Sequence, residues 1–84
     1  MQTAIEQFLA GLVRERGLSP NTVAAYRNDL EQFATFLQER EGIREWSALR
    51  SEHLSAFLNY LRERQYADTT AARKLAAIKS FCQY

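Results

Sequence analysis

Hydroxyl groups, cations and alanines share one face of the segment that begins at Asp68. A helix turns about 100° per residue. Opposite its apolar side, a helix here would present Thr69, Arg73, Ala76, Ala77 and Ser80, with Thr70, Lys74 and Lys79 on the flanks. Small side chains let a backbone approach a groove, while hydroxyl and cationic donors reach phosphate oxygens and base edges, which is the chemistry that duplex DNA requires. The alternative is a solvated face whose alanines favour the helix.

A second polar face lies on the segment that begins at Pro20. Opposite its apolar side this segment carries Asn21, Asn28, Gln32 and Thr35, with Thr22 and Arg27 nearer the edges. The first turn of a helix has free N–H groups and a positive dipole end, so Asn21 and Thr22 could help to bind a phosphate there. The alternative is that both residues only cap the helix.

Catalytic chemistry has little support in this sequence. His53 is the one histidine and falls in the first turn of a predicted helix, where an exposed or capping role is expected. Cys82 lies on an apolar side and is expected to be a small buried thiol. Tyr26, Phe33 and Trp46 fall on or beside apolar stripes, which indicates core packing rather than a platform for bases. No motif for a metal or a cofactor is present.

Two helices are predicted in the first half of the chain. Apolar residues recur at helical spacing from Ile5 to Val13, which predicts a helix over Thr3–Arg16, with Thr3 and Glu6 at capping-box spacing and Gly17 as its stop. Ser19 then caps a second helix with Pro20 at its first position. Its stripe consists of Val23, Tyr26, Leu30, Phe33 and Leu37, and it runs as far as Gly42 over roughly 22 residues.

Two further helices are predicted after a connection over 42–50, in which Ile43 and Trp46 attach to the core. Ser51 is expected to cap the third helix, and Asp68 to cap the fourth after a turn over 65–67. The buried positions of these helices are Leu54, Phe57, Leu58 and Leu61 in the third, and Ala71, Leu75, Ile78 and Cys82 in the fourth. The fourth pattern still runs at Phe81–Tyr84, so we expect the chain to be the front of a longer protein.

Composition limits the protein to one small globular domain. The chain has 84 residues, of which 46% are hydrophobic and 25% charged. Its single cysteine excludes an internal disulfide and favours a reducing compartment, and no apolar run is long enough for a membrane span or signal peptide. The net charge is only +1, but residues 1–64 sum to −1 and residues 65–84 to +2. The fourth helix is therefore the basic one.

The motifs and their order resemble those of a known family. The second segment has the pattern LSxNTxxxYxxDLxxFxxFL and the fourth has TxAARKLAAIKSF. Together these segments resemble the N-terminal core-binding domain of tyrosine recombinases, which include the phage integrases and the Xer-type enzymes. The resemblance covers nearly the whole chain.

The resemblance implies an all-α, SAM-like bundle of four main helices that forms one half of a C-shaped clamp on duplex DNA. It implies that 1–84 is the core-binding domain and that the catalytic domain, with the tyrosine nucleophile, lies outside this chain, so Tyr84 is not that nucleophile. It also implies no cofactor, a cytoplasmic location, and other recombinase protomers as partners. The implied DNA-binding residues are Asn21, Thr22, Tyr26, Arg27, Thr69, Thr70, Arg73, Lys74, Lys79 and Ser80.

Two other functions stay open at this point. The exposed alanines of the fourth helix could instead dock a helix of another protein, without DNA. A helix-turn-helix repressor is disfavoured, because no turn of three or four residues joins two short helices at the required spacing. The modest charge predicts weak, largely non-specific DNA binding by the isolated domain, with a dissociation constant of roughly 10⁻⁴–10⁻⁶ M at physiological salt.

Overall fold

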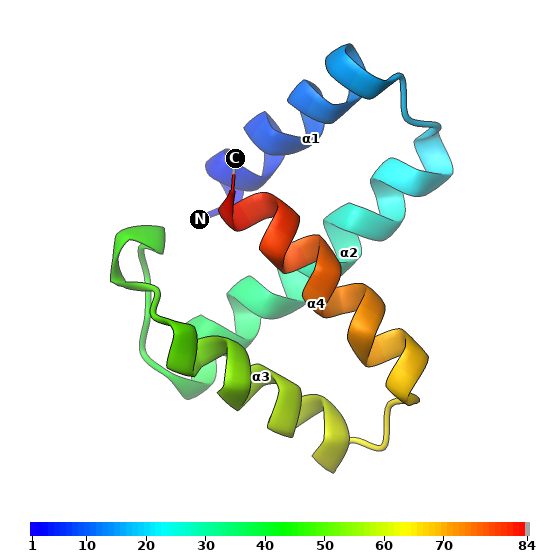
Figure 1. Ribbon diagram of the computed structural model, residues 1–84. Coiled ribbons are helices and arrows are strands. Elements are labelled where there is room, and N and C mark those ends of the chain that lie inside the picture. The colour runs from blue at the N-terminus through cyan, green and yellow to red at the C-terminus, as the bar shows by residue number, and fades with distance from the viewer. Residues whose placement is uncertain (84) are drawn as a thin grey trace.

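The computed structural model describes residues 1–83 and is built of helices alone (Figure 1). In chain order these are α1 (Gln2–Arg16), α2 (Pro20–Arg40), a short 3-10 helix η1 (Trp46–Ala48), α3 (Ser51–Glu63) and α4 (Asp68–Cys82). The all-α class, the four main helices and the turn over 65–67 are confirmed. α4 ends at Cys82, and the prediction that its pattern continues to Tyr84 extends outside the described residues.

The connection between α1 and α2 forms as its residues predict. Gly17 adopts a left-handed conformation with φ 61°, and its N–H bonds to the carbonyl of Val13. The Ser19 hydroxyl accepts a hydrogen bond from the Thr22 N–H at 3.3 Å, and Pro20 occupies the first helical position. α2 then runs for 21 residues and ends slightly before Gly42. Glycine and a serine–proline pair thus set the entry into α2.

Two predicted caps are wrong. α1 begins at Gln2 after Met1, so Thr3 lies inside the helix, and Glu6 bonds to Gln2 and Arg27 instead of to the helix start. The Arg27 guanidinium bonds to both oxygens of that carboxylate, which a single backbone N–H cannot do. Asp68 is the first residue of α4 rather than its cap, where its charge still suits the positive dipole end.

The cap of α3 is also not the expected one. Ser51 is the first helical residue, and His53 in the first turn accepts a hydrogen bond on Nδ1 from the Arg50 N–H at 2.9 Å. This bond satisfies a backbone donor that the helix itself leaves free. The expected capping role of His53 is confirmed, and the capping role of Ser51 is wrong.

His53→Ala is therefore expected to lower the free energy of unfolding by about 1 kcal/mol, the usual cost of a lost cap. Ser51→Ala is the matched control and is expected to change it by less than about 0.5 kcal/mol, as for an ordinary exposed position. Urea unfolding followed by circular dichroism measures both. Equal effects of the two substitutions would contradict the assignment of the cap to His53.

The core lies around α2, which packs against the other three main helices. Leu30, Phe33 and Leu37 of α2 are fully buried, as are Ile5, Phe57, Leu61 and Ile78 from the other helices. In the connection after α2, Ile43 and Trp46 pack against this core as expected. Trp46 stacks on Phe33 with ring centroids 6.1 Å apart, and its indole N–H donates to the Met1 carbonyl at 3.1 Å. No helix within residues 1–83 is long and apolar enough to cross a membrane.

The buried side of α4 is rotated from the predicted one. Its buried residues are Ala71, Lys74, Ala77 and Ile78, whereas Leu75 is half-buried and Cys82 is exposed. α4 packs against both α2 and α3, and in Figure 1 it crosses α2 near the middle of both helices. Two packing partners bury a wider arc than one apolar stripe covers, so the predictions for Lys74 and Ala77 are wrong. The prediction for Cys82 is wrong in the opposite sense, because this last residue of α4 is exposed.

Candidate nucleic-acid interface

A groove lies between the N-terminal half of α2 and the middle of α4. It encloses about 240 Å³ and is lined by Thr22, Ala25, Tyr26, Asp29, Arg73, Ala76 and Ala77. Three of the predicted site residues, Thr22, Tyr26 and Arg73, thus come together from two segments that are far apart in the sequence. Alanine methyl groups contribute to its walls, and the guanidinium of Arg73 is a hydrogen-bond donor at its edge.

The carboxylate of Asp29 contacts two cations of α4. Its Oδ1 accepts from Lys74 Nζ at 2.9 Å and from Arg73 Nη2 at 3.2 Å. Asp29 and Lys74 are buried, with 1% and 3% of their surface exposed. The side chain of Arg73, in contrast, is 57% exposed. Asp29 therefore ties α2 to α4, and only Arg73 of this cluster reaches the surface.

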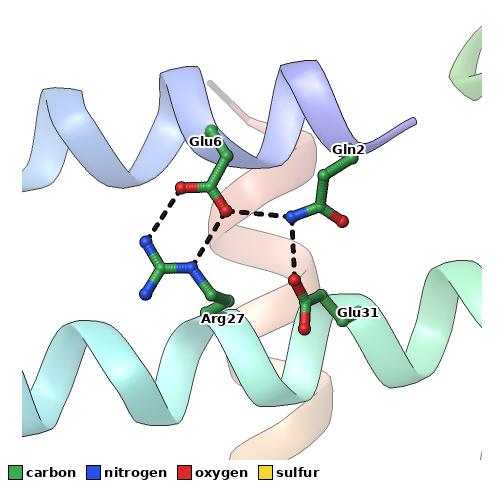
Figure 2. A network of polar contacts seen from close by, with 4 residues as sticks. All are labelled: Gln2, Glu6, Arg27 and Glu31. Carbon is green, nitrogen blue, oxygen red and sulfur yellow. Dashed lines mark hydrogen bonds and ion pairs between the residues drawn. The ribbon is translucent and has the colours of Figure 1, made fainter.

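Arg27 lies on a different side of α2 and already has an acidic partner. It is five residues after Thr22, or about 140° around the helix. Its Nε and Nη2 donate to the two carboxylate oxygens of Glu6 at 2.9 and 2.8 Å, and Gln2 links Glu6 to Glu31 (Figure 2). The hydrogen bond from Arg27 lowers the pKa of Glu6, and the same contact raises the pKa of Arg27. Arg27 thus joins α1 to α2, outside the groove.

The N-terminal turn of α2 has fewer free backbone N–H groups for binding an anion than the sequence indicated. Pro20 has no N–H, and the N–H groups of Thr22 and Val23 already bond to Ser19. The Thr22 hydroxyl also contacts that of Ser19 at 3.0 Å, so Thr22 belongs to the cap. Within residues 1–83 this leaves the N–H of Asn21, whose side chain is exposed.

The remaining predicted residues occupy several parts of the surface. Thr69 and Lys79 are exposed on α4, and Thr70 is half-buried. Ser80 is half-buried beside Arg16 of α1 in a separate hollow. The ring of Tyr26 packs edge-on against Phe8 with centroids 6.1 Å apart, as expected for an aromatic residue on the apolar stripe. The structure therefore gathers some of these residues at the groove and distributes the others around it.

Asp29 is a residue of the groove that was not among the predicted site residues. Its spacing was the available signal, because Asp29 is three residues after Tyr26 and four before Phe33, in register with the buried side of α2. A polar residue in register with a buried face needs a partner of opposite charge or a hydrogen bond. Lys74 on α4 faces Asp29 and is that partner.

No cluster of three or more His, Cys, Asp or Glu side chains within residues 1–83 could hold a metal ion. The Cys82 thiol lies beside Phe81 and Trp46, and desolvation there raises its pKa, the opposite of an activated thiolate.

The fold and the groove define an all-α domain whose candidate site is a binding surface between two helices. Residues 5–84 match the model of the family described as "Phage integrase, N-terminal SAM-like domain". The chain belongs to this family, which confirms the resemblance seen in the sequence and the SAM-like fold.

Curated relatives are bacterial Xer proteins that match over the whole chain or nearly so. The chain is 54% identical to a tyrosine recombinase XerC of Herpetosiphon aurantiacus over all 84 residues, and 48% identical to one of Roseiflexus over 96% of the chain. It is 33% identical to a tyrosine recombinase XerD of Listeria monocytogenes over all 84 residues. The matches cover 27%, 26% and 28% of those proteins, so the chain spans about a quarter of their length. No solved structure matches the chain significantly.

Proposed function

We propose that this chain binds duplex DNA as the core-binding domain of a tyrosine recombinase, with the groove between α2 and α4 as the centre of the contact surface. Membership in the integrase SAM-like family is the observation that carries the proposal. The catalytic domain then lies in the rest of the parent protein, as the share of the relatives' length suggests. Further protomers on the same DNA site are its other partners, in the cytoplasm of a bacterium.

The chemistry of the surface supports this proposal. Arg73 at the groove edge supplies a guanidinium that can bind a phosphate in a bidentate manner, and Thr69 and Lys79 add a hydroxyl and an ammonium group on α4. On α2, Asn21 and Thr22 lie at the positive end of the helix dipole. Arg27 is a peripheral contact, because exposed ion pairs such as that with Glu6 are weak and yield to a phosphate. Lys74 is buried and is left out of the contact set.

Chemical-shift mapping with a short duplex tests the location of the surface. Amides at the start of α2 and on the exposed side of α4 are expected to shift, and the shifts are expected to decrease as salt rises, because counterions then compete for the phosphates. Shifts confined to α1 and α3, or binding that does not respond to salt, would contradict the proposal. Self-association without DNA binding would instead indicate a protein-interaction module.

Arg73→Ala and Lys79→Ala are each expected to weaken DNA binding. Each is also expected to reduce the slope of log K against log salt by about one unit, the value for one lost phosphate contact. Arg62→Ala on α3 is the matched control, because it removes the same charge from an exposed position away from the groove. Fluorescence anisotropy at several salt concentrations measures the slopes. Unchanged slopes for the two α4 variants would mean that the side chains of Arg73 and Lys79 do not contact phosphates.

A further inference from the structure

The cluster of Asp29, Lys74 and Arg73 has an unequal distribution of charge and exposure. Both contacts converge on one oxygen, Asp29 Oδ1, with Lys74 Nζ at 2.9 Å and Arg73 Nη2 at 3.2 Å. Lys74 and the carboxylate are buried together, so they neutralise each other inside the protein. The net charge of the cluster is one positive charge, and it lies on the exposed side chain of Arg73.

The anchoring of Arg73 leaves most of its donors available. A guanidinium has five N–H donors in a rigid plane, and the bond to Asp29 engages Nη2. The rest of the plane can still meet a phosphate at the groove edge. An arginine that is already held in place loses less side-chain entropy on binding than a free one, which increases affinity.

We propose that Asp29 is a positioning residue, which orients the guanidinium of Arg73 toward a DNA phosphate, and that Lys74 preserves the charge of Arg73 by neutralising Asp29. This inference rests on the proposed DNA-binding function. It assigns both buried residues a role in DNA binding, although neither touches the DNA. A purely structural cluster would join α2 to α4 and have no effect on the affinity of the folded protein for DNA.

Two double variants separate positioning from stability and from charge. Asp29→Asn/Lys74→Met and Asp29→Leu/Lys74→Met both remove the buried charges and retain the charge of Arg73. Asparagine and leucine have similar branched shapes, and replacing a buried ion pair by neutral groups is often tolerated. The two variants differ at residue 29 in polarity: asparagine still offers Arg73 an acceptor oxygen, whereas leucine has neither an acceptor nor the amide donors of asparagine.

The Asp29→Asn/Lys74→Met variant is expected to bind a short duplex as the wild type does. The Asp29→Leu/Lys74→Met variant is expected to bind it roughly 3- to 10-fold more weakly, with a smaller salt slope, because Arg73 is no longer held at its phosphate. Circular dichroism first checks that both are folded, and anisotropy titrations at several salt concentrations measure binding. In an Arg73→Ala background the difference between the two variants is expected to disappear.

The single variant Lys74→Met gives an independent result on charge. With Lys74 removed, Asp29 pairs with Arg73 alone, so the slope is expected to fall by about one unit although a buried residue has been changed. Equal DNA binding by the two double variants would overturn the positioning role, and an unchanged slope for folded Lys74→Met would overturn the charge role. If the wild type itself shows no salt-dependent DNA binding, the proposed function fails, which is a different outcome. If Lys74→Met does not fold, Lys74→Gln, which removes the charge and keeps a donor for Asp29, makes the same test of the charge role.

Discussion

Asp29→Ala is expected to destabilise the domain by about 3–5 kcal/mol, the usual cost of removing one partner of a buried ion pair. The substitution leaves the ammonium group of Lys74 buried, with 3% of the residue exposed and without its carboxylate. A chain of 84 residues has a total stability of about 4–13 kcal/mol at 0.05–0.15 kcal/mol per residue. The variant is therefore expected to be largely unfolded at moderate urea concentrations, which circular dichroism measures.

Asp68→Ala is the matched control for this prediction. Asp68 is an exposed aspartate in the first turn of α4, where interaction with the helix dipole contributes about 0.3–1 kcal/mol. Replacing both buried charges, as in Asp29→Leu/Lys74→Met, is expected to recover most of the lost stability. If Asp29→Ala costs no more than Asp68→Ala, the buried pair does not stabilise the contact between α2 and α4.

The helices themselves were predictable because their signals are local. Gly17 and the Ser19–Pro20 pair act on the backbone within a few residues, and the structure uses them as predicted. The apolar stripes of α2 and α3 also follow from spacing alone, since helical period determines which residues share a face. Local backbone chemistry and periodicity are properties that a sequence carries directly.

Caps were less predictable because several residues compete for the same backbone donors. Ser51 and His53 are both suited to the start of α3, and the structure uses the imidazole of His53. Glu6 had the capping-box spacing from Thr3, but a guanidinium 21 residues away in the chain bonds its carboxylate. The position of Arg27 relative to Glu6 depends on the packing of α1 on α2, which spacing within one helix cannot reveal.

The candidate site was predicted only in part, because it also depends on how the helices pack against each other. Projection of α4 alone correctly placed Thr69, Arg73 and Lys79 on the accessible surface. It placed Lys74 there as well, because a lysine beside a polar face is usually solvated. The burial of Lys74 depends on a carboxylate from α2, so only the packed pair of helices shows which cations remain available to a ligand.

Phe33→Ala is the second substitution with a large expected effect, at about 3–5 kcal/mol. Phe33 is fully buried at the centre of the aromatic core, with its ring centroid 5.0 Å from that of Phe57 and 6.1 Å from that of Trp46. Removal of its ring leaves a cavity between α2, α3 and the connection that links them. Val13→Ala on the exposed side of α1 is the control, with an expected effect within about 0.5 kcal/mol.

Trp46 makes this prediction specific, because it is the only tryptophan of the chain and stacks directly on Phe33. Its fluorescence reports on the aromatic core, while circular dichroism reports on the helices. A single cooperative core requires the two signals of Phe33→Ala to change together at a lower urea concentration than in the wild type. If Trp46 becomes solvated while the helices persist, the connection over 42–50 detaches on its own, and Phe33 then stabilises that connection rather than the whole domain.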